Sequence, residues 1–334
     1  MKRLLVVGGG LIGIRHCETI AAHPACELVG LVDPDMDIQI DAPRYADIAE
    51  VTAPVDGVVI ATPTALHAQM GIEAARRGWH MLIEKPVAND LVQSKALLAA
   101  VRRAKVGALV GHHRRYHAPV QQLRSLLKEG AVGRPVTATL IWAAAKPDAY
   151  FNGNWRAAGG SPVMINLVHD IDLLRFLLGE IQQTSSLRGA GFRGKTRIES
   201  GAVALAFASG ATGTITFADV APSPWGFEAG TGENPNIGTT HQDMLWITGT
   251  KGAISFPSMQ LWCGSDWSKP AIQRPLTKAQ NENPPLAAQL DHFLEVMDGA
   301  TPLISVEDAI ETLKTTLTIE NDLLNQSHIK PDPA

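Results

Sequence analysis

The chain has 334 residues, which is enough for about two domains that each bury a core. Hydrophobic residues make up 45%, charged residues 19%, and the formal net charge is −4, so the composition is that of an ordinary globular protein. These values give no support to a nucleic-acid-binding protein or to one that binds membranes through a basic surface. The three cysteines, Cys17, Cys26 and Cys263, lie far apart, which argues against a disulfide framework or a CxxC zinc site and favours the cytoplasm.

The sequence predicts no membrane partner. The apolar run Leu4–Val7 after the basic start is too short for a signal peptide, and no run of about 18 apolar residues predicts a transmembrane helix.

Residues 1–111 alternate short apolar runs with helix-length segments, the pattern of βαβ units around a parallel sheet. The apolar runs are nearly continuous, as expected for strands buried on both faces. The predicted strands are Leu4–Val7, Leu28–Val32, Gly57–Ala61, His80–Ile83 and Val106–Val110, and the predicted helices are Leu11–Ala22, Ala65–Arg77 and Leu91–Lys105. We expect Gly78 to end the second of these helices, because glycine adopts the left-handed conformation at little cost.

Gly8, Gly10 and Gly13 form a G-x-G-x-x-G motif directly after the first predicted strand and at the start of a helix. In that context the first glycine allows a tight turn, the second lets the backbone approach a pyrophosphate, and the third lets helix pack on strand. We expect the pyrophosphate on the free N–H groups of the first helical turn, which include those of Leu11 and Ile12.

Asp33 distinguishes this motif from a glycine-rich turn that binds nothing. It follows the second predicted strand, 20 residues after Gly13, where an acid binds the adenosine ribose hydroxyls of a dinucleotide. Its carboxylate would also repel a 2′-phosphate, and no arginine follows it closely. The sequence therefore predicts NAD as the cofactor, in preference to NADP.

The second half of the chain predicts an α+β domain, with the boundary near residues 111–118. We place a dinucleotide-binding domain at 1–115 and a substrate-binding and oligomerisation domain at 116–334. The predicted strands there are Arg134–Ala145, Gly201–Ala208, Thr212–Val220, Met244–Thr248 and Ala253–Phe256, and the helices are Pro119–Glu129, Val163–Leu178, Leu286–Asp298 and Val306–Gln326. The long irregular stretch Ala221–Thr240 is a candidate lid or pocket segment.

Three further segments identify a family resemblance. They are Ala61-Thr62-Pro63-Thr64-Ala65-Leu66-His67, then Glu84-Lys85-Pro86, and Gly159-Gly160 ahead of His169-Asp170-Ile171-Asp172. Together with the glycine motif they resemble the glucose-fructose oxidoreductase, inositol dehydrogenase and MocA family. The resemblance is strongest over residues 1–180 and loose in the last third.

The resemblance implies an N-terminal Rossmann domain with a doubly wound parallel sheet, and a C-terminal α+β domain with a large, mostly antiparallel, open sheet. It implies nicotinamide-linked oxidation or reduction of a small molecule, a sugar, polyol or related cyclic alcohol, by a homodimer or homotetramer. It also places Thr62, Pro63, His67, Glu84 and Lys85 at the cofactor.

Lys85 is the first candidate for the group that handles the hydroxyl proton. It follows a predicted parallel strand, at the end where open α/β sheets place their ligands. Partial desolvation beside the cationic nicotinamide ring would lower the pKa of a lysine toward that of a useful base. The alternative is a solvated surface lysine, and the match to the family's Glu-Lys-Pro motif favours the catalytic role.

His169 is the second candidate, as a proton relay suited to a group that titrates near neutrality. Ser161-Pro162 predicts an N-cap and first-turn proline, which places His169 about two turns into a helix. The family has an aspartate four residues before this histidine, whereas this chain has Ile165. Asn166 lies on nearly the same predicted face and is a candidate hydrogen-bond partner for a substrate hydroxyl.

Other candidates for substrate contact combine cations with aromatic rings. They are Arg114, Lys146, Tyr150, Trp155 and Arg156, each of which is also compatible with an ordinary surface-loop position. No spacing such as HExxH predicts a metal site. Two alternatives to a simple dehydrogenase stay open: an NAD-binding regulator without activity, because Ile165 replaces the family acid, and an enzyme that uses the redox step to break a glycosidic bond.

Overall fold

A computed structural model describes residues 1–151, 161–193, 197–234, 236–264, 266–269 and 271–326. These residues fall into two compact units, one made of Met1–Tyr116 with Glu282–Lys314 and the other of His117–Asn281 with residues from Thr315 onward. The chain therefore returns to the first unit after building most of the second. The sequence analysis instead divides the chain once, at 115/116, and places all later residues in the second domain.

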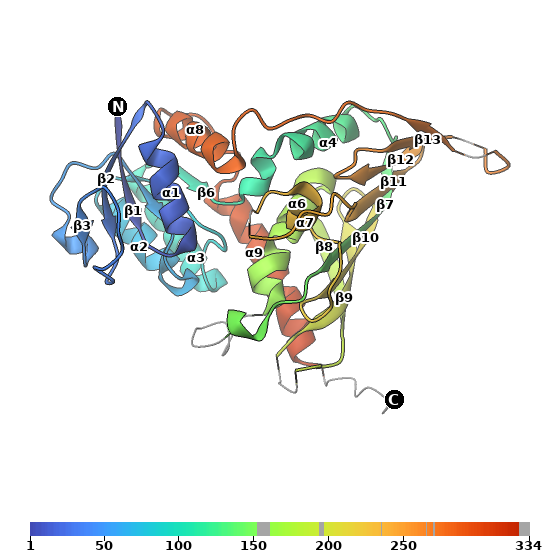
Figure 1. The fold of residues 1–334 in the computed structure, drawn as a ribbon, viewed down its shortest axis with the longest axis horizontal. Coiled ribbons are helices and arrows are strands. Elements are labelled where there is room, and N and C mark those ends of the chain that lie inside the picture. Colours follow the sequence, from blue (N-terminus) through green and yellow to red (C-terminus); the bar gives the residue numbers. More distant parts are fainter. Residues whose placement is uncertain (152–160, 194–196, 235, 265, 270, 327–334) are drawn as a thin grey trace. The chain divides into compact units, whose positions relative to one another are not determined.

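The first unit is built around a six-stranded parallel sheet with the strand order β3-β2-β1-β4-β5-β6 (Figure 1). Its elements up to residue 116 are β1 Lys2–Val7, α1 Leu11–Ala21, β2 Cys26–Val32, β3 Arg44–Tyr45, the 3-10 turn η1 Ile48–Glu50, β4 Gly57–Ile60, α2 Thr64–Arg76, β5 His80–Ile83, α3 Leu91–Ala104, β6 Ala108–Val110 and the 3-10 turn η2 His113–Tyr116. The predicted Rossmann sheet is confirmed. The sequence missed only β3, which has two residues and no apolar run.

The register of this sheet lines up the last residues of five strands. Val7 pairs with Val32 and with Ile60, Ile60 pairs with Ile83, and Ile83 pairs with Val110. Because the strands are parallel, the residues that follow them emerge along one edge of the sheet. The strand order changes direction between β1 and β4, which is where such sheets bind ligands.

Residues 282–314 complete the first unit with α8, Pro285–Met297, and the start of α9, Val306–Leu324. The side chain of Phe293 is fully buried, Val110 N–H donates to Ile304 O at 3.0 Å, and His23 Nε2 lies 2.8 Å from Asp291 Oδ1. The sequence predicted both helices but assigned them to the second domain, because apolar periodicity does not say which sheet a helix covers.

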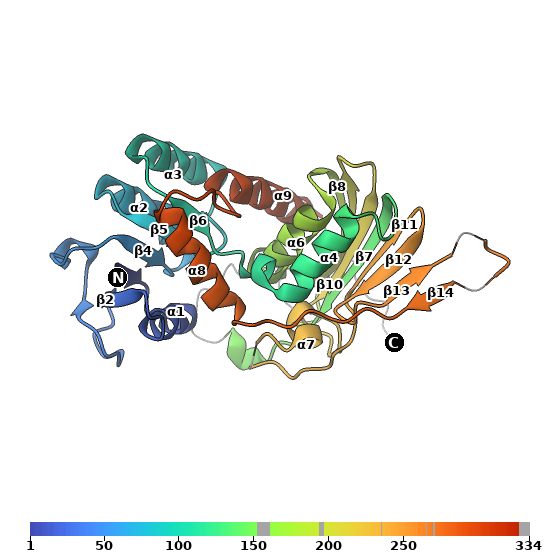
Figure 2. The ribbon, with the colours of Figure 1, turned by 90° about the horizontal axis from the view of Figure 1, so that it is seen from above.

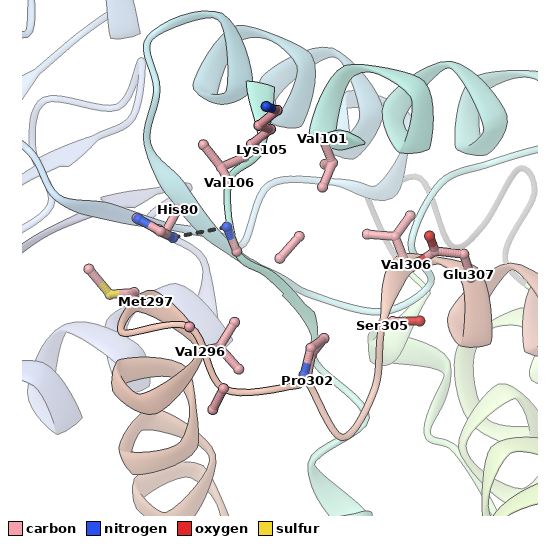
Figure 3. Close-up of a pocket in the computed structure, with 14 residues that line it drawn as sticks. His80, Val101, Lys105, Val106, Val296, Met297, Pro302, Ser305, Val306 and Glu307 are labelled. Atoms are coloured by element: carbon pink, nitrogen blue, oxygen red, sulfur yellow. Dashed lines mark hydrogen bonds between the residues drawn. The ribbon is translucent and has the colours of Figure 1, made fainter. Parts of the chain in front are cut away.

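A hollow of about 320 Å³ lies where this returning segment meets the starts of β5 and β6 (Figure 3). It is lined by His80, Gly107, Val296, Ser305 and Glu307 among others, and Gly107 N–H donates to His80 Nδ1 at 2.9 Å. Since His80 begins β5 and Ile83 ends it, the hollow lies at the opposite edge of the sheet from the glycine motif. It is therefore separate from the candidate cofactor site.

The second unit is built on an eight-stranded sheet with the order β14-β13-β12-β11-β7-β10-β9-β8, in which only β7 and β10 are parallel neighbours. Its elements are α4 Ala118–Lys128, β7 Pro135–Ala143, the 3-10 turn η3 Asp148–Tyr150, the π-helical turn η4 Val163–Leu167, α6 Val168–Leu178, β8 Ile181–Arg188, β9 Ser200–Phe207, β10 Thr212–Ala218, α7 Phe227–Thr231, β11 Leu245–Gly249, β12 Gly252–Phe256, β13 Leu261–Cys263 and β14 Ile272–Arg274. The predicted large, mostly antiparallel sheet is confirmed.

One face of this sheet carries the core and is covered by α4 and α6 (Figure 2). Along β10, Gly213, Ile215 and Phe217 are buried, while the threonines between them are exposed. This alternation is expected of an antiparallel sheet that packs one face on the core and exposes the other to solvent. The sequence missed β8 because Gln182, Gln183 and the serines give it no apolar run, and it missed β13, β14 and the short α7 inside Ala221–Thr240. No helix in the described part of the chain is long and apolar enough to span a membrane.

Candidate cofactor and substrate site

The glycine motif forms the turn from β1 into α1, and two of its glycines are required by contact. Gly8 has φ +103°, and a Cβ on it would lie 2.5 Å from Ala61 O. A Cβ on Gly13 would lie 1.9 Å from Gly8 O, so only glycine lets α1 pack this closely on the turn. Both contacts agree with the roles expected for the first and third glycines.

Gly10 differs from these two glycines because it faces open space. A Cβ on Gly10 would meet no atom within 4 Å, and Gly10 caps α1 without a side-chain hydrogen bond. The first N–H groups of the helix, including those of Leu11 and Ile12, have no partner inside the helix. Leu11 itself is 75% exposed. The start of α1 therefore offers room and N–H donors for a pyrophosphate.

Asp33 lies directly beside the glycine motif. Its Oδ2 accepts from Gly9 N–H at 2.6 Å, and its Oδ1 accepts from Asp35 N–H at 2.9 Å. Arg44 Nη1 donates to Ile38 O at 3.1 Å, which ties the segment after Asp33 to β3. The sequence gave no sign of Arg44 near this segment, because the short strand β3 that brings it there was not predicted.

Thr62, Pro63 and His67 follow β4. Pro63 is exposed at the start of α2, and the buried Thr62 Oγ1 has no hydrogen-bond partner among the described residues. His67 is buried, with Nδ1 2.7 Å from Pro86 O and Nε2 2.8 Å from Thr62 O. Its ring therefore meets backbone carbonyls on both sides and connects the segment after β4 to the segment after β5.

Glu84 follows β5 and forms a buried pair with His16 of α1, whose Nε2 lies 2.9 Å from Glu84 Oε1. Burial raises the pKa of Glu84, but the hydrogen bond and charge of His16, with the charges of Lys85 and His113, outweigh it and lower the pKa to about 2. A Cβ on Gly111 would lie 3.1 Å from Glu84 Cδ, so the carboxylate is also packed against the segment after β6.

His16 is a site residue that sequence reasoning missed. It belongs to the buried stripe of α1 with Gly13, Cys17 and Ile20, at the spacing expected for the covered face of a helix. A histidine in such a stripe, three residues after the glycine motif, was the available signal. Lys85 follows Glu84, is half-buried, and its N–H donates to Glu84 Oε2 at 3.2 Å.

The features of this edge fit a dinucleotide. The start of α1 is uncapped and open, Thr62 carries an unpartnered buried hydroxyl, and an acid stands at the end of β2. The first unit thus brings together every residue that the sequence assigned to the cofactor. No cluster of three or more His, Cys, Asp or Glu side chains suited to a metal ion occurs among the described residues.

His169 lies in the second unit, where it is buried near the start of α6. Ser161 caps this segment: its Oγ accepts from Met164 N–H at 3.2 Å and donates to Glu320. The segment was predicted to be α-helical from Val163, but its first five residues form the π-helical turn η4. Such turns carry i→i+5 hydrogen bonds and occur often at functional sites.

Ile165 and Asn166 lie in η4 and are both half-buried, whereas Val163 and Leu167 are buried. Asn166 Oδ1 accepts from Lys146 Nζ at 2.6 Å. The Lys146 ammonium lies 4.9 Å from the centre of the Tyr150 ring. The second unit therefore brings three of the predicted substrate residues, Asn166, Lys146 and Tyr150, together.

The segment that carries Lys146 is anchored by arginines. Arg193 Nη2 donates to Lys146 O at 2.8 Å, and its Nη1 donates to Asp219 Oδ1 at 2.8 Å. Arg197 Nη2 donates to the other oxygen of the fully buried Asp219 at 2.5 Å, and its guanidinium lies 3.7 Å from the centre of the Phe151 ring. Two guanidiniums on one buried carboxylate hold this part of the unit rigidly.

The remaining predicted substrate residues are placed as follows. Arg114 lies in η2 of the first unit and is only 2% exposed. Trp155 and Arg156 fall outside the described residues.

Two family models match the chain, "Oxidoreductase family, NAD-binding Rossmann fold" over residues 2–112 and "GFO/IDH/MocA C-terminal domain" over residues 120–255. The scyllo-inositol 2-dehydrogenase (NAD(+)) of Bacillus subtilis is 26% identical over 360 residues, which cover 99% of this chain and 96% of that protein. The uncharacterized oxidoreductase YrbE of the same organism is 27% identical over 63% of this chain, and the match spans 65% of its length. Matches to several further relatives span about half of their length.

Among solved structures, the WlbA dehydrogenase from Bordetella pertussis in complex with NADH and UDP-GlcNAcA has a TM-score of 0.78 at 20% identity. The similarity covers 96% of this chain and 95% of that one. At this identity it shows a shared fold over both units.

Proposed function

Since the chain belongs to the GFO/IDH/MocA oxidoreductase family, whose N-terminal domain is an NAD-binding Rossmann fold, we propose that it is an NAD-dependent dehydrogenase or reductase. The substrate class we propose is a sugar, polyol or related cyclic alcohol, as in the inositol dehydrogenase relative. The observation that carries this proposal is the edge of the parallel sheet, where Lys85 follows directly from a buried pair, Glu84 and His16. His16 lies on the helix that begins at the glycine motif.

The chemistry divides between cofactor and protein. Bound NAD supplies the hydride acceptor. In the direction of oxidation, Lys85 Nζ removes the proton from the substrate hydroxyl, and His169 relays it or holds the hydroxyl by a hydrogen bond. Asn166 and Lys146 hold a neighbouring hydroxyl, because their amide and ammonium groups offer donors at one place.

The proposed preference for NAD rests on charge. Asp33 accepts from the glycine loop with one oxygen and from the following turn with the other, and Asp35 and Asp37 follow it in that exposed segment. A 2′-phosphate placed beside Asp33 would meet these like charges, whereas ribose hydroxyls would donate to the carboxylate.

The proposal is tested by screening polyols, sugars and sugar acids with NAD and following NADH absorbance. With the best substrate, Lys85→Ala should lower kcat by about 100-fold or more, the usual scale for a positioned base, with the Kd of NADH nearly unchanged. Lys95→Ala, on the exposed face of α3, is the matched control and should keep full activity. Full activity of Lys85→Ala would remove Lys85 from the mechanism.

A second candidate function is an NAD-binding regulator without activity, which Ile165 favours because it stands where the family has an acid. The same screen distinguishes the two functions: NADH binding without turnover of any substrate would support the regulator.

The third possibility is an enzyme that uses the redox step to break a glycosidic bond. Analysis of the products formed from a glycoside would reveal this cleavage in place of simple oxidation.

We further propose that the protein forms a homodimer or homotetramer through the solvent-exposed face of the eight-stranded sheet. Four exposed, uncharged side chains lie there, Thr139, Thr212, Thr214 and Thr216. Thr216 also lines a hollow of about 580 Å³ together with Trp225. Sedimentation analysis should show an oligomer, and Thr214→Lys should shift it toward monomer. A monomer at micromolar concentration would contradict this assembly.

A further inference from the structure

The segment Glu84-Lys85-Pro86 carries the proposed proton acceptor, and its position depends on contacts made by the residues on either side of Lys85. These contacts come from two buried histidines on different helices. The inference below rests on the proposed function of Lys85 and concerns what holds it in place.

His16 contacts the segment on one side. Its Nε2 lies 2.9 Å from Glu84 Oε1, and the two side chains are 3% and 6% exposed, so water cannot replace this hydrogen bond. The other Glu84 oxygen accepts from Lys85 N–H. Glu84 is thus bound at both oxygens, one to α1 and one to the backbone of Lys85 itself.

His67 contacts the segment on the other side. Its Nδ1 lies 2.7 Å from Pro86 O, and its Nε2 lies 2.8 Å from Thr62 O. Both partners are carbonyl oxygens, which only accept hydrogen bonds, while a neutral imidazole has a single N–H to donate. A protonated ring would satisfy both carbonyls and a neutral ring only one, so the strength of this bridge depends on the charge of His67.

The groups that face these rings decide that charge. Burial lowers the pKa of His67, the Pro86 and Thr62 carbonyls and Glu84 raise it, and Lys85 lowers it. Around Glu84 the charged neighbours are His16, Lys85 and His113. The two histidines therefore belong to one electrostatic cluster with Lys85.

We propose that His16 and His67 are positioning residues that clamp Glu84-Lys85-Pro86 from its two sides and thereby fix the place and the proton affinity of Lys85. The clamp also couples Lys85 to the cofactor loops. His16 lies on α1, which begins at the glycine motif, and His67 bridges to Thr62, two residues before α2. Binding of NAD at either loop is then transmitted to Lys85 through a single histidine.

The test uses the whole 334-residue chain with His16→Gln and His67→Gln. His80→Gln is the matched control, because His80 begins the same strand β5 and accepts from Gly107 N–H at the far edge of the sheet. For each protein we would measure kcat, KM, the Kd of NADH, and the titration of Lys85 by NMR after reductive ¹³C-methylation, assigned with Lys85→Arg. The NMR readout needs no substrate.

Both clamp variants should shift the midpoint of the Lys85 titration and lower kcat by about 10-fold or more, the scale of a misplaced catalytic group, while KM and the Kd of NADH change less. His80→Gln should leave the titration and kcat unchanged. If the clamp variants lose thermal stability like His80→Gln but keep the Lys85 titration of the unsubstituted protein, the proposal is wrong.

Two further outcomes are separable. If Lys85→Ala is fully active, the proposed function of Lys85 fails, and the Lys85 titration in the histidine variants still decides the clamp. If the variants do not fold, the unsubstituted protein decides it: the clamp requires slowly exchanging, hydrogen-bonded ring N–H resonances from His16 and His67. Rings that exchange rapidly with water would overturn the clamp.

Discussion

The Asp33 carboxylate both shapes the glycine loop and sets the charge beside it. One oxygen binds Gly9 N–H inside the glycine loop, and the other binds Asp35 N–H in the turn that follows. Removal of the carboxylate therefore affects the shape of the loop as well as the charge that a cofactor meets.

We expect Asp33→Ser to weaken NAD binding and to reduce the preference for NAD over NADP. The reason is that serine keeps a short polar group but loses the charge that accepts from ribose hydroxyls and opposes a phosphate. Titrations of both reduced cofactors, followed by NADH and NADPH fluorescence, measure the two Kd values. Asp47→Ser, in the cap of η1, is a control that also removes a capping carboxylate of the first unit. An unchanged ratio of the two Kd values would remove Asp33 from cofactor selection.

Ile165 gives a second prediction at the scale of the residue, because it is half-buried between the buried side chains Val163 and Leu167. Ile165→Asp should be tolerated and should shift the pH-rate profile or the substrate preference by returning a carboxylate to the helix of His169. Leu167→Asp, the matched variant, should unfold the protein or lower its Tm strongly because it buries an unpaired charge. Equal losses of Tm would show that Ile165 is a core residue.

At the scale of elements, the glycine loop separates a packing role from a binding role. A Cβ on Gly13 collides with Gly8 O, whereas a Cβ on Gly10, whose φ of −68° suits any residue, meets open space. The two positions are three residues apart in the same turn and are expected to respond differently to the same substitution.

Gly10→Ala should leave Tm nearly unchanged and weaken NADH binding about 10-fold or more, because the new methyl group occupies space that the pyrophosphate needs. Gly13→Ala should lower Tm, since the backbone of α1 must move away from β1 despite the better helix propensity of alanine. Thermal unfolding and NADH titration of the two variants give the result. A stable Gly13→Ala protein with normal NADH affinity would contradict the packing argument.

The elements of the first unit were predictable because each buried parallel strand is an apolar run bounded by turn residues, as Gly57–Ile60 and His80–Ile83 illustrate. The row formed by Val7, Ile60 and Ile83 then brings the residues predicted to bind the cofactor to one edge of the sheet. The partners of these residues were not predictable, because the distance between His16 and Glu84, or between Lys146 and Asn166, depends on tertiary packing that no local pattern encodes. The π-helical turn was missed for the same reason, since α and π turns share the same apolar composition.

For the whole molecule, two buried groups make stability depend on pH in separate ranges. The pKa of His67 is lowered from its ordinary 6.5 by burial, so the unfolded chain binds the proton first, and stability falls as pH decreases below about 6.5. The pKa of Glu84 is lowered from 4.5 to about 2, so its contribution is present above 4.5 and is lost as pH falls toward 2.

We therefore expect the free energy of unfolding, measured by urea titration at a series of pH values, to decline in these two ranges. His67→Gln should flatten the upper decline and leave the lower one, and Glu84→Gln should do the reverse. Asp41→Asn is a control at an exposed bend of the same unit and should change neither range. A decline between pH 7 and 5 that persists unchanged in His67→Gln would assign it to another histidine.

The return of residues 282–314 to the first unit affects how the protein is made. Val110 N–H donates to Ile304 O, and Gly57 packs near Met297. These contacts, and the burial of Phe293, form only when α8 and the start of α9 are in place. A ribosome must therefore synthesise the chain well past residue 282 before the parallel sheet has its last cover. Until then the nascent sheet keeps an apolar surface exposed, and contacts of such long sequence separation form slowly. Expression of residues 1–116 alone should yield an aggregating fragment, and translation speed or chaperone supply should limit the yield of the intact protein.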